Sequence, residues 1–322
     1  MPNGSQPERP KLVPARGKRE RMWALLERPD VLGYLLMTPA ALIIFLFVAY
    51  PFAWGVWMSL TNKQIGMPWS QVQFVGLRNY VDLATKDKVF WTTTFNSFVY
   101  TGVATIVKFI LGIWLALLLN RMVRFQRFVR AAVLLPWIVP TVLSTIAFLW
   151  IFDPDFSVIN WTLRQFAVWM GWGPVRGPLW LADPLLALAS VTFVNIWRGV
   201  PFYAIFFLAG LQTINPELYE AAAIDGASAW QRFWYVTLPG IRPIIVVVLV
   251  FSVIVTFSDF QVVYVLTRGG PANSTHLFAT YAYQVAMMGT RLGLGAAVSL
   301  FMFPVLAVLI ILQLLYVRRE HA

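Results

Sequence analysis

Three charged side chains lie inside long apolar segments, where a charge is costly. Lys108, Arg198 and Asp259 interrupt stretches that otherwise have the composition of membrane-spanning helices. A charge at the bilayer centre costs about 2.5–3.5 kcal/mol on insertion scales, so such residues usually face protein or water. These three predict either a polar translocation cavity or a buried ion pair that holds helices together, and the two interpretations are compatible.

Polar and aromatic side chains accompany these charges at helical spacing. One set has offsets of 0, 3, 4 and 7, which places it on one helix face: Asn195, Arg198, Gly199 and Phe202. A second set repeats the offsets: Ser252, Val255, Thr256 and Asp259. Such faces could line a polar cavity. Stripes of this kind also serve as packing faces, and spacing alone does not decide between the two roles.

The motifs of common enzyme classes are absent. The sequence contains no G-x-x-x-x-G-K-[ST] phosphate-binding loop, no H-E-x-x-H and no G-x-S-x-G. It has no cysteine, which excludes thiolate catalysis, and its two histidines, His276 and His321, cannot form a histidine metal cluster. We therefore predict no catalytic residue, no metal site and no cofactor bound by this chain.

The overall composition indicates which elements position these residues. Of 322 residues, 59% are hydrophobic and 12% are charged, whereas a soluble domain has roughly 45–50% apolar and about 25% charged residues. The composition excludes a disordered, collagen-like or disulfide-stapled protein. The net charge of +11 first indicates membrane topology, so we predict a lipid bilayer and no nucleic acid as partner.

The hydrophobic pattern predicts an all-α integral membrane protein with six transmembrane helices. The spans cover the hydrocarbon layer of ~30 Å at 1.5 Å per residue. Their predicted ranges are Val31–Asn62, Phe90–Leu119, Ala131–Phe152, Leu185–Leu211, Ile244–Val265 and Gly293–Tyr316. Segments on the side of the termini hold 15 Lys or Arg in 79 residues, against 8 in 86 on the other side. The positive-inside rule therefore places both termini in the cytoplasm.

The chain divides into a tail and one membrane domain. Residues 1–30 form a predicted cytoplasmic N-terminal tail, and residues 31–322 form one predicted six-helix membrane domain, because no loop is long enough for a separate soluble domain. Basic and apolar residues alternate in Gly17–Arg28. This segment is predicted to be either an interfacial helix or the basic flank of the first span.

The loop between the fourth and fifth spans, residues 216–239, has its own local signals. Pro216 fits the first turn of a helix, and Glu217 lies where the helix dipole favours a carboxylate. Gly226 can end this helix in a turn, and a second short helix is expected to stop at Pro239. Physical reasoning alone leaves a docking element and a tight connection between spans equally open.

This loop resembles a known family. Glu220-Ala221-Ala222, Gly226 and Leu238-Pro239 resemble the EAA loop of permease subunits of binding-protein-dependent ABC importers. The longer pattern, which includes Ile224-Asp225-Gly226, is similar to the carbohydrate branch with the maltose and glycerol-phosphate permeases. The similarity extends from about Phe98 to Tyr316 and includes Leu266-Thr-Arg-Gly-Gly-Pro271.

The resemblance implies a type I importer in the cytoplasmic membrane of a bacterium or archaeon. It implies a second, related permease subunit as a heterodimer partner, two ATPase subunits that carry ATP and Mg²⁺, and an extracytoplasmic solute-binding protein. The residues implied to couple the chain to the ATPase are Glu220, Ala221, Ala222, Asp225, Gly226, Leu238 and Pro239. Hydrolysis belongs to the partner, and this chain is a transport subunit.

The same resemblance places the two stripes on the solute path. Their eight positions align with the sugar-lining positions of the maltose permease, whereas Arg198 and Asp259 replace uncharged residues there. The substrate class implied is a sugar or sugar derivative. Because Lys108 and Arg198 oppose a single Asp259, an acidic or phosphorylated sugar is a second possibility.

Two other classes of protein compete with an ABC permease. An ion-coupled secondary transporter could use Lys108, Arg198 and Asp259 as coupling charges. Such proteins often carry inverted repeats, and no convincing repeat relates the two halves of this sequence. A membrane enzyme or assembly factor is disfavoured by the missing catalytic motifs.

Overall fold

The computed structural model describes residues 29–121, 125–173 and 176–320. These residues form helices joined by short loops, with an isolated β-bridge between Thr61 and Phe74. The chain separates into two units, residues 1–55 and 56–322, and each is described by itself. The segment Gly17–Arg28, predicted as an interfacial helix or basic flank, lies outside the described residues.

The first unit contains one long apolar helix with a local widening. Helix α2 (Pro29–Ile44) continues through the π-helical turn η1 (Phe45–Ala49) into α3 (Tyr50–Ser59). In η1 the amide of Tyr50 donates to the carbonyl of Phe45. Pro51 follows at once and has no amide to donate, so a wider turn accommodates it without a break in the helix.

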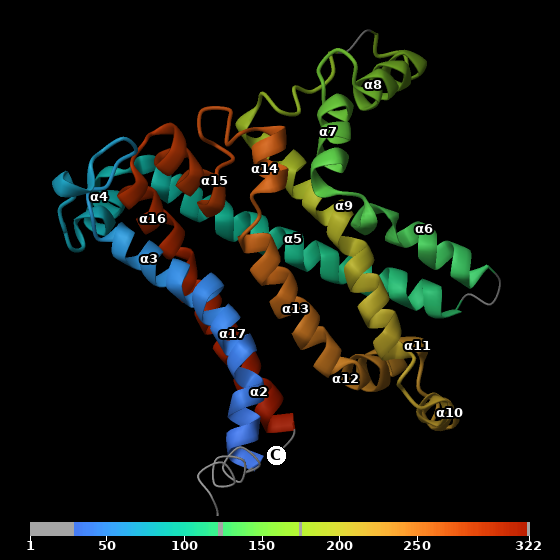
Figure 1. The fold of residues 1–322 in the computed structure, drawn as a ribbon. Coiled ribbons are helices and arrows are strands. Elements are labelled where there is room, and N and C mark those ends of the chain that lie inside the picture. The colour runs from blue at the N-terminus through green and yellow to red at the C-terminus, as the bar shows by residue number, and fades with distance from the viewer. Residues whose placement is uncertain (1–28, 122–124, 174–175, 321–322) are drawn as a thin grey trace, which may run out of the picture. The chain divides into compact units, whose positions relative to one another are not determined.

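The second unit is organised around two long helices that cross. Helix α5 (Lys88–Arg121) and α9 (Pro184–Leu211) make the most extensive helix contact, and α13 (Arg242–Phe257) packs against both. Figure 1 shows α5 crossing α9. A β carbon at Gly112 would lie 2.3 Å from the β carbon of Tyr203, so the absence of a side chain there permits the close approach.

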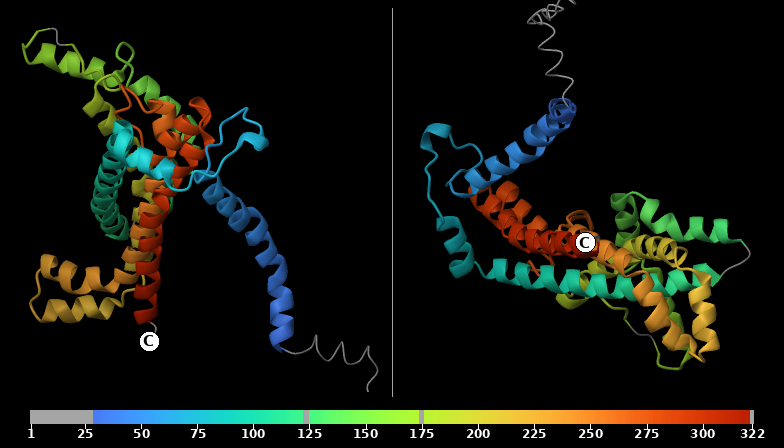
Figure 2. Two further views of the ribbon diagram at one scale, coloured as in Figure 1. Left: turned by 90° about the vertical axis from the view of Figure 1, so that its left-hand side faces the viewer. Right: turned by 90° about the horizontal axis from the view of Figure 1, so that it is seen from below.

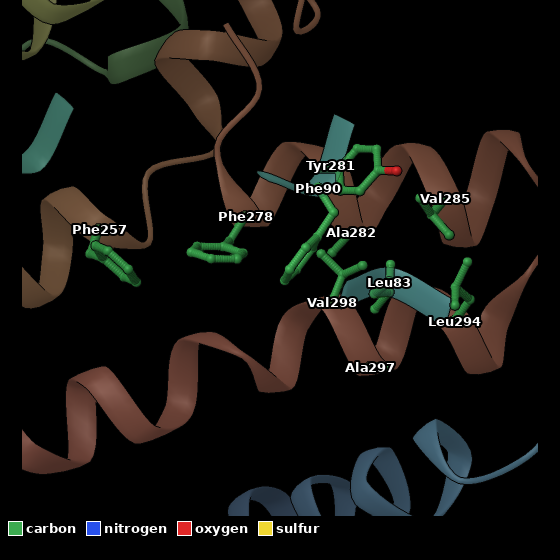
Figure 3. Close-up of a cluster of buried hydrophobic side chains, with 10 residues drawn as sticks. All are labelled: Leu83, Phe90, Phe257, Phe278, Tyr281, Ala282, Val285, Leu294, Ala297 and Val298. Atoms are coloured by element: carbon green, nitrogen blue, oxygen red, sulfur yellow. The ribbon is translucent and has the colours of Figure 1, made fainter. Parts of the chain in front are cut away.

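Short helices surround the ends of these spans that the charge count predicts to be extracytoplasmic. Helix α4 (Arg78–Lys86), α15 (Phe278–Tyr283), the π turn η4 (Gln284–Met288) and α16 (Leu292–Leu300) enclose a buried cluster with the start of α5. Figure 3 shows its members: Leu83, Phe90, Phe257, Phe278, Tyr281, Ala282, Val285, Leu294, Ala297 and Val298. This apolar core fixes the outer ends of α5 and α13. The remaining elements there are the 3-10 turn η2 (Trp69–Gln71) and α14 (Gln261–Leu266).

His276 is a buried loop residue in the same region. Its Nδ1 atom lies 3.2 Å from Oγ1 of Thr280, and its ring fills the space beside Gly269, where a β carbon would approach the ring within 2.0 Å. Burial lowers the pKa of His276 to about 4, so the imidazole is neutral at pH 7. His276 is therefore a buried packing residue in this structure.

The predicted third span differs from the structure. Residues Ala131–Phe152 were expected to form a single helix, but α6 (Gln126–Ile138) and α7 (Thr141–Ile151) meet at a bend of 86°. Val139 is extended because it precedes Pro140, whose ring disfavours a helical conformation of the preceding residue. The prediction of one straight helix was wrong at this point.

The number of apolar spans agrees with the predicted class. Five segments are long and apolar enough to cross a membrane, and the bent pair makes up to six within the described residues. The last apolar segment along the chain consists of α16 followed by α17 (Met302–Glu320), and Phe301 separates these two helices. The all-helical membrane fold is thus as predicted, while the side on which the termini lie stays a prediction.

Two groups of helices project from opposite ends of the second unit. Helix α8 (Val158–Trp169) lies at one end, and α10 (Pro216–Ile224), α11 (Ala229–Arg232), the π turn η3 (Phe233–Thr237) and α12 (Leu238–Gly240) lie at the other. Figure 2 shows both groups in its left view. Since the membrane spans run between them, the α10–α12 loop and α8 face opposite sides of the bilayer.

The close crossing of α5 and α9 yields a test of the fold. We expect Gly112→Ala to lower the free energy of unfolding by about 1–3 kcal/mol, because the added methyl group must displace Tyr203. Gly102→Ala is the matched control, since a β carbon there has no neighbour within 4 Å. Thermal unfolding of the purified chain in detergent measures the difference. Equal stability of the two variants would contradict the packing described.

Candidate functional site

A chain of polar side chains crosses the interior where α5, α9 and α13 meet. Lys108 of α5 is 3% exposed, and its Nζ atom donates to Oδ1 of Asn195 at 3.0 Å and to Oγ1 of Thr256 at 2.7 Å. The amide nitrogen of Asn195 donates to Oδ2 of Asp259 at 2.9 Å. Asn195 therefore connects the buried ammonium to the carboxylate, and each group has polar partners within the protein.

Asp259 lies at a break between helices rather than on one. Helix α13 ends at Phe257 and α14 begins at Gln261. The Oδ1 atom of Asp259 accepts from the amide of Val262 at 3.3 Å, and Oδ2 also accepts from the hydroxyl of Tyr100 at 2.7 Å. The helix that carries Thr256 ends before Asp259, so the predicted continuation of that helix face to Asp259 was wrong.

Gly199 makes room for the lysine. A β carbon at Gly199 would lie 2.3 Å from Cδ of Lys108. The alkyl chain of Lys108 thus passes directly over the backbone of α9 on its way to Asn195. This contact gives Gly199 a packing role beside the polar network.

A small cavity opens beside this network. Its volume is about 70 Å³, which is room for two or three water molecules at ~30 Å³ each. Seven of the eight stripe residues line it: Asn195, Arg198, Gly199, Phe202, Ser252, Val255 and Thr256. Lys108 lines it as well, whereas Asp259 does not. The structure therefore brings together the residues that the spacing selected, with that one exception.

Aromatic rings form one wall of the cavity. Phe202 stacks on Trp137 of α6 with ring centroids 5.0 Å apart and lies 5.1 Å from the ring of Phe251. The sequence reasoning missed Trp137, Tyr203 and Phe251. Extending the two stripes by one helical turn would have found Tyr203, four residues after Gly199, and Phe251, four before Val255. Nothing in the spacing pointed to Trp137, since it comes from another helix.

The cavity lining is positively charged. Lys108 and Arg198 line it, and no carboxylate is among its described lining residues. The Nε atom of Arg198 is buried and has no hydrogen-bond partner among the described residues. A buried unpaired donor beside a cavity is suited to an acceptor group of a solute.

The direct ion pair considered from the sequence is replaced by a bridged arrangement. Within the described ranges, ion pairs are found at Arg78–Asp82 and Lys86–Asp82, both on α4. Lys108 and Asp259 interact through the side chain of Asn195. The network therefore holds three helices together and also presents polar atoms to the cavity.

The α10–α12 loop has well-defined helix ends. Oδ1 of Asn215 accepts from the amide of Glu217 at 3.0 Å and caps α10, whose first turn begins at Pro216 as predicted. Gly226 has φ +80°, and its amide donates to Ala223 while the amide of Ala227 donates to Ala222. These two bonds form a Schellman motif, in which a left-handed residue ends the helix.

The second half of the loop departs from its prediction at Pro239. The helix was expected to stop there, but η3 leads into α12, which ends at Gly240. In η3 the amide of Leu238 donates to the carbonyl of Phe233. This wider turn accommodates Pro239 as η1 accommodates Pro51.

The residues implied to couple the chain to an ATPase lie mainly at the surface. Glu220, Ala221, Asp225, Gly226 and Pro239 are exposed, and Ala222 and Leu238 are half-buried. The carboxylate of Glu220 forms no ion pair with a described residue. Ile224 is 86% exposed at the end of α10.

Comparison with known proteins identifies the family. Residues 108–321 match the model of the family described as "Binding-protein-dependent transport system inner membrane component". The chain belongs to this family. The match includes the polar network from Lys108 onward, the cavity and the α10–α12 loop, and it confirms the family inferred from the loop motif.

The chain is similar in sequence to known permease proteins over most of their length. The chain is 34% identical over 276 residues to the trehalose/maltose transport system permease protein MalF of Thermococcus litoralis, covering 86% of this chain and 90% of that protein. It is 35% identical over 275 residues to the sulfoquinovosyl glycerol transport system permease protein SmoG of Agrobacterium fabrum, covering 85% and 86%.

A solved transporter has the same fold. A chain of the bacterial ABC transporter involved in the import of the acidic polysaccharide alginate matches with a TM-score of 0.75 and 26% identity, covering 93% of this chain and 99% of that chain. The same transporter in complex with its alginate pentasaccharide-bound periplasmic protein matches with a TM-score of 0.76 and 25% identity, covering 94% and 98%. The permease fold predicted from the sequence is confirmed.

The bridging role of Asn195 can be tested by its removal. We expect Asn195→Leu to lower the free energy of unfolding by about 1–3 kcal/mol, because Lys108 and Asp259 each lose a buried hydrogen bond. Thr192→Val on the same helix is the control, since the Thr192 hydroxyl donates to Leu188 of its own helix. Unfolding in detergent measures both, and an Asn195→Leu variant as stable as the control would exclude the bridge.

Proposed function

We propose that this chain is the membrane-spanning permease subunit of an ATP-driven importer that carries a sugar or sugar derivative. The observation that carries the proposal is the family match over residues 108–321, which spans both the cavity and the α10–α12 loop. The relatives named above are permeases of sugar transport systems. This chain would form the path of the solute through the membrane, and partner subunits would supply free energy from ATP hydrolysis.

The solute would pass along the cavity between α9 and α13. Phe202 and its neighbouring rings offer apolar faces on which a sugar ring can stack, and Asn195, Ser252 and Thr256 offer hydrogen-bonding groups. A volume of about 70 Å³ is far below the roughly 300–1,000 Å³ of ligand pockets. Passage of a sugar therefore requires α9 and α13 to separate, or a second subunit to complete a wider path.

The α10–α12 loop would transmit that movement. The proposal assigns the coupling role to Glu220, Ala221, Ala222, Asp225, Gly226, Leu238 and Pro239, with Glu220 pairing with a basic residue of the ATPase. Its support is the exposed surface of α10 and the rigid end that Gly226 gives the helix. A helix whose two ends are well defined transmits a displacement better than an irregular loop does.

The complete transporter would contain further subunits. We propose a related permease as heterodimer partner, two ATPase subunits that bind ATP and Mg²⁺, and an extracytoplasmic solute-binding protein, in the cytoplasmic membrane of a bacterium or archaeon. The solved alginate transporter was crystallised with a periplasmic protein, which supports the last partner. An ion-coupled transporter that uses Lys108, Arg198 and Asp259 has no such support from the relatives.

An anionic sugar is a second candidate for the substrate. Lys108 and Arg198 make the cavity lining positive, and Arg198 has a buried unpaired nitrogen. One similar transporter is described as importing an acidic polysaccharide. Neutral sugars remain compatible with the aromatic wall.

Variants at Gly226 test the coupling role. We expect Gly226→Val to abolish solute-stimulated ATP hydrolysis in the assembled transporter, because a β-branched residue at φ +80° costs at least roughly 1–2 kcal/mol and unwinds the end of α10. Gly226→Asn should retain most activity, since asparagine tolerates this conformation. Hydrolysis and the amount of inserted protein are measured together.

Gly171→Val is the matched control for that experiment. Gly171 has φ +75° and ends α8 with the same pair of hydrogen bonds, at the opposite end of the unit. It should impose similar strain and leave coupling intact. If Gly226→Val and Gly171→Val reduce hydrolysis equally, the effect is general destabilisation and the loop has no special role.

The charge of the substrate can be tested at Arg198. If the substrate is anionic, Arg198→Gln should reduce uptake of an acidic sugar about tenfold more than uptake of a neutral analogue, because one charge-assisted hydrogen bond is worth roughly 1.5–3 kcal/mol. Competition for uptake in reconstituted vesicles measures the ratio. An equal reduction for both sugars would exclude recognition of a negative charge by Arg198.

A further inference from the structure

A second cavity lies at the base of the α10–α12 loop. It has a volume of about 340 Å³ and is bounded by the last turn of α5, the end of α9 and the loop itself. Figure 1 shows α10 and α11 next to the end of α9. This cavity shares no residue with the small cavity beside Lys108, and transport of a solute gives it no role.

The cavity is basic on one side. Arg121 and Arg232 line it together with the polar side chains of Asn120 and Tyr219, and no carboxylate is among its described lining residues. Neither arginine forms an ion pair with a described acidic residue. Arg121 stands in the last turn of α5 and Arg232 in the last turn of α11.

Arg232 carries a buried, unsatisfied donor. Its Nε atom is inaccessible and has no hydrogen-bond partner among the described residues. A buried guanidinium nitrogen without an acceptor is costly, and a phosphate oxygen satisfies such a donor well. The geometry thus calls for an anionic acceptor in the cavity.

The position of the cavity selects the kind of anion. Both α5 and α9 are apolar enough to cross a membrane, and their ends at Arg121 and Leu211 line the cavity. It therefore lies at the level of the phospholipid headgroups. Leu117 and Phe233 provide an apolar wall, which suits the start of an acyl chain and gives no advantage to a free phosphate ion.

We propose that this cavity binds the phosphate-bearing headgroup of an anionic membrane phospholipid, with Arg232 as the principal contact and Arg121 as the second. Basic pockets between membrane helices are typical sites for such headgroups. At ~30 Å³ for each water-sized group, the volume holds about ten such groups, the size of a phosphate with a short polyol. The lipid would fix the base of the loop against α5.

Lipid titration of the full-length chain in neutral detergent, followed by native mass spectrometry, tests the proposal. Phosphatidylglycerol should bind more tightly than phosphatidylcholine with the same acyl chains. Arg232→Gln should weaken phosphatidylglycerol binding about fivefold, the factor for one basic residue at an anionic lipid surface, and leave phosphatidylcholine unchanged. Arg232→Lys should have a smaller effect because it keeps the charge and loses the planar fork.

Arg127→Gln provides the control, because Arg127 is exposed on α6 and does not line the cavity. It removes the same charge and should leave binding unchanged. Equal binding by Arg232→Gln and Arg127→Gln overturns the proposal. Displacement of the lipid by millimolar inorganic phosphate also overturns it, since the site would then take a free anion. Size-exclusion profiles establish folding, and Arg121→Gln replaces Arg232→Gln if the latter does not fold.

Discussion

The need to satisfy one buried ammonium group organises the centre of this molecule. Lys108 lies within an apolar helix and reaches neutral partners on two other helices, Asn195 and Thr256. An unpaired charge at that depth would cost several kcal/mol. Because the partners come from α9 and α13, the requirement also fixes how closely these helices approach α5. Gly112 and Gly199 are the residues that permit the approach.

The same arrangement separates the polar network from the loop that is proposed to couple the chain to an ATPase. The polar network lies in the middle of the spans, whereas the loop from α10 to α12 lies at their end, and α9 connects the two as one unbroken helix from Pro184 to Leu211. Asn195 and the end of α9 nearest the loop therefore belong to one helix, with Pro201 between them. The family match covers both regions.

Much of this architecture follows from local sequence signals. The apolar segments, the start of α10 at Pro216 and its end at Gly226 depend on composition and on residues within one or two helical turns. Some features of the structure were not predicted from the sequence. The contribution of Trp137 to the cavity depends on how separate segments pack, whereas the bend at Val139 and the hydrogen bond from Val262 to Asp259 follow from neighbouring residues that the helix pattern did not take into account. Pro51 and Pro239 belong to an intermediate case, because a π turn preserves the helix where a break is normally expected.

The size of the cavity beside Lys108 has a consequence for the cell. A space for two or three waters, walled by the rings of Trp137, Phe202 and Phe251, is no conduit for nutrients or salts. Under the proposed function, a permease closed in this way would hold ion gradients between transport cycles. The seal would lie in the side chains of the proposed path, and partner subunits would supply the work of opening.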